Sequence, residues 1–469
     1  MPHPWIPNSS LNVKREMMKH LGISDIMELF SDVPRSLILK GPLNIGFNRS
    51  LTEYEVVRKF EEITSGDKVF KSPPPFIGGG FCAHYVPAAV KALISRAEFY
   101  TAYTPYQPEV AQGLLQSIFE YQSLMAELYA VDVVNASLYN GSTAAAEAVR
   151  MALRVKRGRR KVLISKTSHP EVREVIKTWL RGTGATAVEV GYDRETGEVS
   201  LNKLKSLLNS DVAAVYIEYP NFFGIVESVT KDVIEEAHRA GALAIVFSNP
   251  IALGVLEPPG RLGADIVVGD TQPLGAGLNF GGPSAGILGI KEDRAMLRQL
   301  PGRLIGATTT IDGDELGYMM ILQTREQHIR RERATSNITT NSNLMAIAAA
   351  IYTSLLGSEG FKRIGQAILG RTRYALKKLS AIDDIRAPLF SNRAFFRELP
   401  IGFKRFRRAS DVIKKLLGMG IHIGPALGRF YKELKEGCLI CVTELHTRRD
   451  IDMLATSLSE ITSGGGLDV

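Results

Sequence analysis

Between about residue 109 and residue 290, short runs rich in β-branched residues alternate with helical stretches of about ten residues. The predicted strands are 131–138, 161–165, 187–190, 212–218, 243–247, 265–269 and 281–290, and the predicted helices are 112–129, a stretch after Asn140, 171–180, 201–207 and 231–240. This alternation is typical of a mostly parallel sheet with helices on both faces. We therefore expect an α/β fold, with strand 281–290 at an edge of the sheet.

The regions on either side of this alternation have different patterns. The first ~75 residues have helical periodicity over 13–21 and 23–30, a capping box at Thr52–Glu55, and a proline run at 73–75 that ends any helix. Beyond residue 335, predicted helices 343–356 and 361–380 precede short strands near 395–398, 421–423 and 439–443 and a last helix over 449–461. We predict a helical arm with aromatic loops over 1–108, a large α/β domain over 109–334 and a smaller α+β lobe over 335–469.

The composition of the 469-residue chain is that of an ordinary globular protein, with 45% apolar and 23% charged residues. Apolar runs such as 345–352 are much shorter than the roughly 20 residues that cross a bilayer. The opening MPHPWIPNSS lacks the basic and apolar regions of a secretory signal, so we expect a cytoplasmic protein without a membrane segment.

The net charge of +8 is modest for this length and does not require a nucleic-acid partner. The basic runs lie at 156–161, 325–333 and 404–408. Each is typical of a solvated helix end or loop, or of a docking face for an acidic partner. No RNA- or DNA-binding motif accompanies them, so we expect no nucleic-acid binding.

The chain has three cysteines, an odd number that gives no disulfide framework. Cys438 and Cys441 form a C-x-x-C pattern, but they lie in CLICVTEL, which is typical of a strand. Positions i and i+3 of a strand face opposite sides, so the two thiols should not converge. We predict buried strand cysteines and no metal site.

The segment ASLYNGSTAAAEA (136–148) predicts a strand, a tight loop and a helix start. Amides at a helix N-terminus favour an anion, and the hydroxyls of Ser142 and Thr143 add two donors. A phosphate or carboxylate site and a plain N-cap both fit this pattern. His169 follows the next strand at the same sheet edge, where either a ligand-stacking role or a structural hydrogen bond is consistent with its position.

Two loops combine aromatic residues with glycine or proline. They are FIGGGFCAHYVP (76–87) and EFYTAYTPYQPE (98–109). Rigid aromatic loops line ligand pockets or subunit interfaces, and they also brace cores. The candidate residues in them are His84, Tyr85, Tyr103, Thr104, Tyr106 and Gln107.

These segments together resemble the glycine cleavage system P-protein, the glycine decarboxylase, and more narrowly its N-terminal half, which in many prokaryotes is a separate subunit 1. The resemblance spans almost all of residues 1–460. The segments that carry it are FIGGGFCAHYVP, EFYTAYTPYQPE, ASLYNGSTAAAEA, LNFGGPSAGILGIKEDRAMLRQLPGRLIG and LQTREQHIRRERATSNITTN. The resemblance implies the aspartate-aminotransferase-like fold of pyridoxal-phosphate enzymes (fold type I). In that fold a ring lies over the cofactor near the place of His169, and a loop like 140–144, here with Ser142 and Thr143, holds its phosphate.

The chemistry of this family requires a lysine that forms a Schiff base and an acidic partner for the pyridine nitrogen. The resemblance places Gln272 at the lysine position, and no lysine occurs between Lys231 and Lys291. After the predicted strand 243–247 the sequence has Ser248 and Asn249 where the family's aspartate is expected. We therefore expect vestigial cofactor contacts at Ser142, Thr143 and His169, no covalently bound cofactor, and no catalysis by this chain alone.

The resemblance also implies a role within a complex. The pyridoxal phosphate and the catalytic lysine would belong to a partner, subunit 2, in an α2β2 heterotetramer. The complex would decarboxylate glycine and transfer the aminomethyl group to the lipoyl arm of the H-protein, as an aminomethyl-transferring glycine dehydrogenase. The aromatic loops would complete the partner's site, and Arg325, His328 and Arg330, on a predicted helix over 325–333, would hold the interface or receive the H-protein; a solvated salt-bridged helix is the alternative.

Two other functions remain open at this stage. A cofactor-less scaffold or regulator would bind an anion or effector at the Ser142 loop and catalyse nothing. A self-sufficient homodimeric pyridoxal-phosphate lyase would need the lysine that the sequence lacks.

Overall fold

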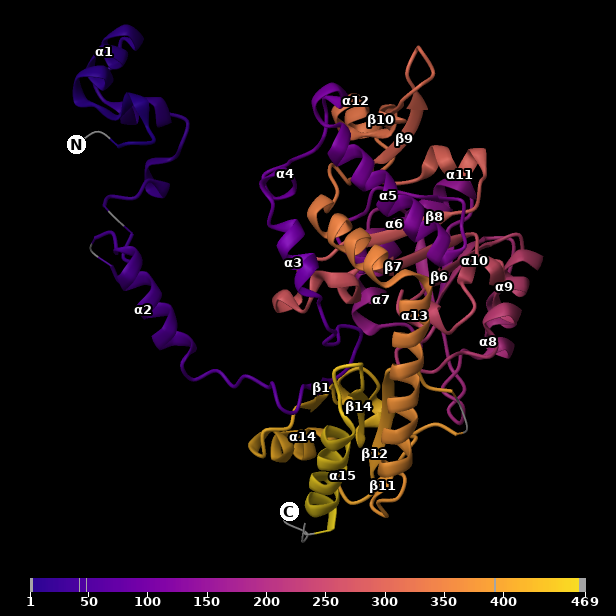
Figure 1. Ribbon diagram of the computed structural model, residues 1–469. Helices are drawn as coiled ribbons and strands as arrows, with labels where there is room; N and C mark the ends of the chain where they lie inside the picture. The colour runs from indigo at the N-terminus through magenta and orange to yellow at the C-terminus, as the bar shows by residue number, and fades with distance from the viewer. Residues whose placement is uncertain (1–2, 42, 48, 392–393, 464–469) are drawn as a thin grey trace. The chain divides into compact units, whose positions relative to one another are not determined.

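The computed structural model describes residues 3–41, 43–47, 49–391 and 394–463, and it divides into two compact units, Met1–Val69 and Phe70–Val469 (Figure 1). The sequence places the end of the arm at 108, whereas this division falls after residue 69. Both aromatic loops therefore belong to the second unit. The division of that unit at residue 334 stays a prediction.

The second unit is built on a seven-stranded sheet with the order β2-β8-β7-β6-β5-β3-β4. Its strands are β2 (Val133–Val134), β3 (Lys161–Ser165), β4 (Thr186–Val190), β5 (Val212–Glu218), β6 (Leu243–Phe247), β7 (Ile266–Asp270) and β8 (Gly286–Ile290). Strands β4, β3, β5, β6 and β7 pair in parallel, and β8 is antiparallel to both of its neighbours. The expected mostly parallel sheet is confirmed.

The predicted edge position of the strand over 281–290 is wrong, because β8 lies between β7 and β2. The glycines of β8 explain its interior position. A Cβ at Gly286 would meet the Asn140 carbonyl oxygen at 2.3 Å, and one at Gly289 would meet Val131 at 2.8 Å. A strand without side chains at these positions fits between crowded neighbours rather than at an open edge.

Helices cover both faces of this sheet. They are α5 (Gln112–Tyr129), α6 (Gly141–Val155), α7 (Pro170–Leu180), α8 (Leu201–Leu207), α9 (Thr230–Arg239), α10 (Pro259–Leu262) and α11 (Arg294–Gln299). Alternate strand residues enter different clusters: Leu163 packs with side chains of α5 and α9, whereas Val162 and Ile164 pack with α6 and α7. Because both faces are buried, the strands are apolar throughout rather than alternating.

The C-terminal part of this unit begins with α13 (Asn343–Leu379), which is kinked at Gly357 (φ 57°) between the two predicted helices. A three-stranded antiparallel sheet follows, in the order β11-β12-β14. Its elements are β11 (Ile385–Arg386), β12 (Glu398–Phe403) and β14 (Gly437–Cys441), with α14 (Ala409–Gly418) and α15 (Arg448–Ser463). The short β1 (Phe76–Ile77) pairs in parallel with β13 (Ile423–Gly424), so the first aromatic loop is attached to this part.

One helix in the described chain, α13, is long and apolar enough to span a membrane by length and composition alone. Its most apolar 18-residue window has a mean hydropathy of 1.4, and half of that window is buried inside the protein. Buried core helices of soluble proteins also meet this criterion, so the helix is weak support for a membrane segment.

Several elements differ from the sequence prediction or were missed by it. The hairpin of β9 (Leu304–Thr309) and β10 (Leu316–Ile321) was not predicted. The predicted continuous helix over 325–333 is wrong, because this segment is divided into three short helices (η8, Gln323–Arg325; α12, Gln327–Arg330; η9, Arg331–Arg333). Extended backbone at Glu326 (ψ 160°) and a positive φ at Arg331 (52°) interrupt the helix. The remaining short elements are α3 (Ala88–Ile94), α4 (Ala97–Tyr100), η4 (Pro108–Val110), η5 (Ala252–Gly254), η6 (Gln272–Ala276), η7 (Asn279–Gly281), η10 (Leu427–Arg429) and η11 (Lys432–Leu434).

The first unit consists of short helices and connecting segments: η1 (Pro7–Ser9), α1 (Leu11–Leu21), η2 (Ile26–Phe30), η3 (Arg35–Leu37) and α2 (Glu53–Thr64). The predicted capping box is confirmed, with the Thr52 side chain accepting from the Glu55 amide and Glu55 accepting from the Thr52 amide. No residue of α1, η2, η3 or α2 is buried. These helices therefore form without a core of their own in the described chain.

Candidate functional site

A cavity of about 420 Å³ lies beyond the carboxyl ends of the parallel strands, where open α/β sheets bind their ligands. Loops that follow β3, β5, β6 and β7 contribute to its wall, together with the start of α6, the glycine run 79–80 and the start of β12. The polar and charged side chains in its lining are Asn140, Ser142, His169, Glu171, Glu218, Asn221, Asn249, Asp270, Gln272, Arg397 and Glu398.

The start of α6 at the cavity is already capped by the chain itself. Asn140 is the N-cap and its side chain accepts from the Thr143 amide at 2.8 Å. The Gly141 amide donates to Asp270 Oδ2 at 2.6 Å, and a Cβ at Gly141 would meet the Asp270 Cβ at 2.9 Å. Ser142 lines the cavity, whereas Thr143 is buried and is not among the lining residues. The chain's own oxygens therefore already accept from the amides of Gly141 and Thr143 at this helix start, and ligand binding at this loop stays a prediction.

Asp270 is the carboxylate that takes the place of an external anion at this helix start. Besides the Gly141 amide, it accepts from the Gln272 amide at 2.8 Å and from the Ser284 hydroxyl at 3.2 Å. Burial raises the pKa of its carboxyl group, and these three donors oppose the rise. Sequence reasoning missed Asp270, although an acidic residue at the end of a predicted parallel strand was a usable signal.

Gln272 lies next to Asp270, in the turn η6, and it is 2% exposed. Its Nε2 donates to the Cys82 carbonyl at 2.9 Å and to the Gly277 carbonyl at 3.2 Å. Its Oε1 has no hydrogen-bond partner among the described residues. The amide is thus held by backbone carbonyls of two loops, and an amide cannot form a Schiff base.

The residues after β6 are polar but not acidic. Asn249 lines the cavity, and its side-chain oxygen accepts from the Ile251 amide at 2.9 Å. The Ser248 carbonyl accepts from the buried Tyr129 hydroxyl at 2.7 Å. Asn249 thus stabilises local backbone, Ser248 binds a distant side chain, and neither supplies a carboxylate to the cavity.

A second carboxyl group that sequence reasoning missed is Glu218, at the end of β5. It is buried, it accepts from the Tyr216 hydroxyl at 3.1 Å and from the His169 amide, and burial raises its pKa to about 7. It is the last residue of the predicted strand 212–218, and this place at the carboxyl edge of the sheet was the signal that could have indicated a role.

His169 is the N-cap of α7 and lines the cavity. Its Nδ1 accepts from the Glu171 amide at 3.1 Å, and its Nε2 donates to the Gly79 carbonyl at 2.6 Å. Burial lowers the pKa of the ring, which favours this neutral form. The structural hydrogen-bonding role is therefore present, and the stacking role stays a prediction.

The first aromatic loop (76–87) is bound to the C-terminal part of the second unit through Glu444. The Nδ1 of His84 contacts the Glu444 carboxylate at 2.9 Å, and the Tyr85 amide donates to the same carboxylate at 2.7 Å. His84 is buried, whereas the Tyr85 side chain is exposed. Of this pair, only Tyr85 has an exposed side chain.

The second aromatic loop (98–109) and the basic segment (325–333) meet around a buried arginine. Arg303 donates to the Tyr106 hydroxyl at 3.0 Å, its guanidinium lies 5.0 Å from the Tyr106 ring centre, and it pairs with Glu326 at 3.7 Å. The Tyr106 ring also contacts the His328 ring at 6.3 Å. Arg303 is 2% exposed and was not singled out from the sequence.

The other candidates of these segments divide into held and exposed residues. Thr104 is buried, and its hydroxyl lies 3.4 Å from that of Thr340. Arg325 donates to the carbonyls of Leu322, Leu300 and Gly302, and burial lowers its pKa. The exposed candidates are Tyr103, Gln107, His328 and Arg330.

The model of the glycine cleavage system P-protein family matches residues 3–458 of this chain. The chain belongs to this family. A probable glycine dehydrogenase (decarboxylating) subunit 1 of Staphylothermus marinus is 46% identical over 464 residues, covering 98% of both chains. A protein of the same name from Sulfurisphaera tokodaii is also 46% identical, over 98% of this chain and 99% of that protein.

Solved structures agree with this assignment. An inhibitor-bound glycine decarboxylase (P-protein) of the glycine cleavage system is 36% identical, with a TM-score of 0.86, covering 98% of this chain and 100% of its own. A sphingosine-1-phosphate lyase of Burkholderia pseudomallei (15% identical, TM-score 0.63, 90% and 93% covered) and a NifS-like protein (14%, 0.59, 82% and 98%) share the fold. The fold is fold type I of the pyridoxal-phosphate enzymes, as the sequence predicted.

That fold family depends on pyridoxal phosphate, which requires a lysine for its Schiff base and free amides for its phosphate. No lysine is among the described residues that line the cavity, whereas Gln272, Asn249 and Asp270 are. A phosphate at the start of α6 would compete with Asp270 for the Gly141 amide. The residues present do not fit covalently bound pyridoxal phosphate.

Proposed function

We propose that this chain is the non-catalytic subunit 1 of a heteromeric glycine dehydrogenase (decarboxylating), an aminomethyl-transferring oxidoreductase of the glycine cleavage system. The complex decarboxylates glycine and passes the aminomethyl group to the lipoyl arm of the H-protein. The observation that carries the proposal is the lining of the cavity, which has Gln272 and no lysine among its described residues. The names of the relatives, each called subunit 1, support a heteromeric assembly.

In this proposal the partner, subunit 2, carries the lysine and the pyridoxal phosphate. The present chain contributes surface to the partner's site and to the assembly, which we propose is an α2β2 heterotetramer in the cytoplasm. The exposed side chains of Tyr85 and Tyr103, together with Tyr106, are the parts of the aromatic loops available for this role. Lipoylated H-protein would meet the complex at the basic segment with His328 and Arg330, both exposed.

The first arm of the test uses the chain alone. We purify it with pyridoxal phosphate, record the visible spectrum and treat it with borohydride. We expect no absorbance band that borohydride fixes onto a lysine, because the described lining of the cavity contains none. A reduced pyridoxyl-lysine found by peptide mass mapping would overturn the proposal.

The second arm measures exchange of carbon dioxide with glycine in the presence of lipoylated H-protein. We expect activity only when both subunits are present. Full activity of the partner alone would leave the present chain as a scaffold or regulator.

A further inference from the structure

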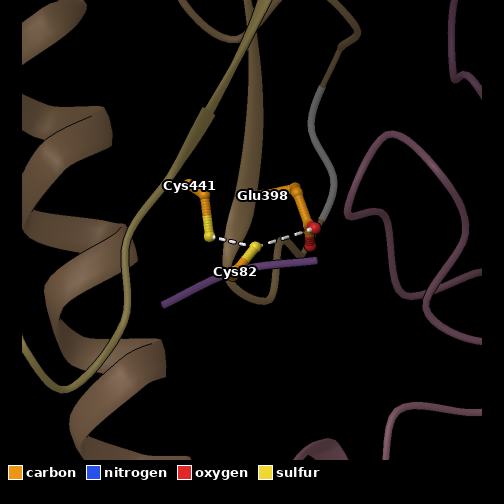
Figure 2. A group of neighbouring side chains, drawn as sticks. All are labelled: Cys82, Glu398 and Cys441. Atoms are coloured by element: carbon orange, nitrogen blue, oxygen red, sulfur yellow. Dashed lines mark hydrogen bonds between the residues drawn. The ribbon is translucent and has the colours of Figure 1, made fainter. Parts of the chain in front are cut away.

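Two of the three cysteines meet beside the cavity, at a point that the proposed activity does not use. Cys82 lies in the first aromatic loop and Cys441 at the end of β14, and Figure 2 shows their sulfurs pointing toward each other. The Cys441 thiol donates to the Cys82 sulfur across 2.6 Å, and the Cys82 thiol donates to Glu398 Oε1 at 3.5 Å. The residues that meet are thus separated by 359 positions along the chain.

The fold places these residues together through strand register. Glu398 and Cys441 are direct partners in the antiparallel pair β12–β14, so their side chains share one face of that sheet. The pairing of β1 with β13 holds the 76–87 loop against the same face, where a Cβ at Gly78 would lie 3.4 Å from the Cys441 Cβ. Cys438 lies three residues earlier on β14 and packs into the other face, where its thiol donates to the Leu439 carbonyl.

A cation is a poor occupant of this cluster, although two sulfurs and a carboxylate are potential ligands. The buried Arg397 guanidinium already binds both Glu398 oxygens, at 2.9 and 3.0 Å, and the Gly80 amide donates to one of them at 3.3 Å. Two thiolates on one tetrahedral zinc ion lie about 3.8 Å apart, because each Zn–S bond is about 2.3 Å. The sulfurs here are much closer, and a metal ion would lie next to a fixed positive charge.

We propose that Cys82 and Cys441 are a disulfide-forming pair that joins the first aromatic loop to the C-terminal part of the protein. The oxidant is a small disulfide of the glutathione type. The Cys82 thiolate attacks one sulfur of the oxidant and releases one small thiol; the Cys441 thiolate then attacks Cys82 Sγ and releases the second. Two protons and two electrons leave the cysteines and are carried by the two released thiols, so the exchange is balanced.

Forming the bond would disturb few of the surrounding contacts. Both cysteines are buried, at 0% and 1% exposure, and burial together with the neighbouring Cys82 raises the pKa of the Cys441 thiol well above its usual value. Disulfide formation removes the weak contact of Cys82 with Glu398, which keeps its hydrogen bonds to Arg397 and to the Gly80 amide. Because both sulfurs are covered, exchange requires the loop to lift from β14 or to be caught before it docks.

The bond would fix one wall of the cavity. Gly79, Gly80 and Phe81 line the cavity, the Gly79 carbonyl binds His169, and the Cys82 carbonyl binds the Gln272 amide. Cross-linking Cys82 therefore restrains the loop that holds both side chains. In the reduced protein the same loop is held only by hydrogen bonds and packing.

The test is a thiol count and a peptide map of the full chain, refolded with glutathione disulfide and, in parallel, with reductant. We expect one titratable thiol out of three after oxidation, a mass lower by two hydrogens, and a linked peptide that contains Cys82 and Cys441. Cys438→Ser is the matched control and should leave no titratable thiol after oxidation. Cys82→Ser and Cys441→Ser should each leave two.

A second measurement separates the bond from an effect of substitution on folding. Wild-type protein should gain roughly 4 °C or more in Tm on oxidation, because the bond closes a long loop, and amide exchange in 76–87 should slow. Three titratable thiols after oxidative refolding would overturn the proposal. So would about one equivalent of zinc in the protein as isolated that Cys82→Ser removes.

Discussion

The cavity wall in the second unit and the helices of the first unit use their side chains in opposite ways. Around the cavity, most polar groups are bound within the chain: Asp270 accepts three hydrogen bonds, and Gln272 and His169 bind backbone carbonyls of neighbouring loops. In α2, by contrast, Phe60 and Ile63 are each 62% exposed, and the helix buries none of its residues.

The cavity wall is therefore internally satisfied, whereas the described helices of the first unit lack a core to pack against. A site whose donors and acceptors already satisfy each other has few groups left for chemistry on a substrate. Helices with an apolar face and no core are stable mainly when that face packs against something else. We therefore expect the first unit to contribute to assembly and the cavity wall to contribute to the stability of the fold.

The largest expected effect comes from the first unit. Deleting residues 3–69 should abolish co-purification with the partner subunit and lower the activity of the mixed complex more than about tenfold, because roughly 20 cal/mol or more is lost for each Å² of apolar surface that assembly buries. The measurement is size-exclusion chromatography of the two chains, followed by the carbon dioxide exchange assay.

A point variant controls for the deletion. Phe60→Gln should weaken association with the partner, whereas Arg58→Gln, on the opposite face of α2, should not. The free energy of unfolding of the chain alone should stay within about 0.5 kcal/mol of the wild type for both variants, since both side chains are exposed. Equal affinity of both variants for the partner would remove α2 from the interface.

The second-largest effect tests whether the cavity wall stabilises the fold. Asp270→Ala should lower the free energy of unfolding by about 3 kcal/mol, because the amides of Gly141 and Gln272, both buried residues, lose the carboxylate that accepts from them. Urea unfolding measures this loss. Asp293→Ala is the control: Asp293 also caps a helix, α11, but it is exposed, so about 1 kcal/mol is expected. Equal losses would mean that the cavity carboxylate has no special structural role.

The smallest effect is a pH dependence from Glu218, whose pKa burial raises to about 7 in the folded protein, from 4.5. The folded state therefore binds the Glu218 proton more tightly than the unfolded state does. The stability that this proton binding contributes is fully present below about pH 4.5 and is lost as the pH rises through 7. Glu218→Gln cannot ionise, so from pH 5 to 8 it should lose about 2 kcal/mol less stability than the wild type.

Thermal or urea unfolding at several pH values measures this slope. Some slope should remain in the variant, because burial also raises the pKa of Glu227 to about 7. Glu171→Gln, an exposed carboxylate at the same cavity, is the control and should leave the slope unchanged. Identical slopes in wild type and Glu218→Gln would show that Glu218 is ionised in the folded protein at these pH values.

The sequence predicted several elements of the second unit closely because their patterns are local. Helix 112–129 and strands 161–165 and 243–247 match α5, β3 and β6 residue for residue. Strand order is not local, and β8 was misplaced because a glycine-rich strand looks the same at an edge and between two neighbours. The helix over 325–333 failed because Glu326 and Arg331 take non-helical conformations that tertiary contacts select.

The candidate site shows the same limit. The sequence by itself determined that Gln272 stands in a stretch without lysine, since an absent residue cannot be restored by folding. The carboxylate that caps α6, the arginine that holds Tyr106, and the contact of Cys82 with Cys441 were decided only by the tertiary structure. Each joins residues more than 100 positions apart, and such contacts depend on strand order, register and loop docking, which no local pattern encodes.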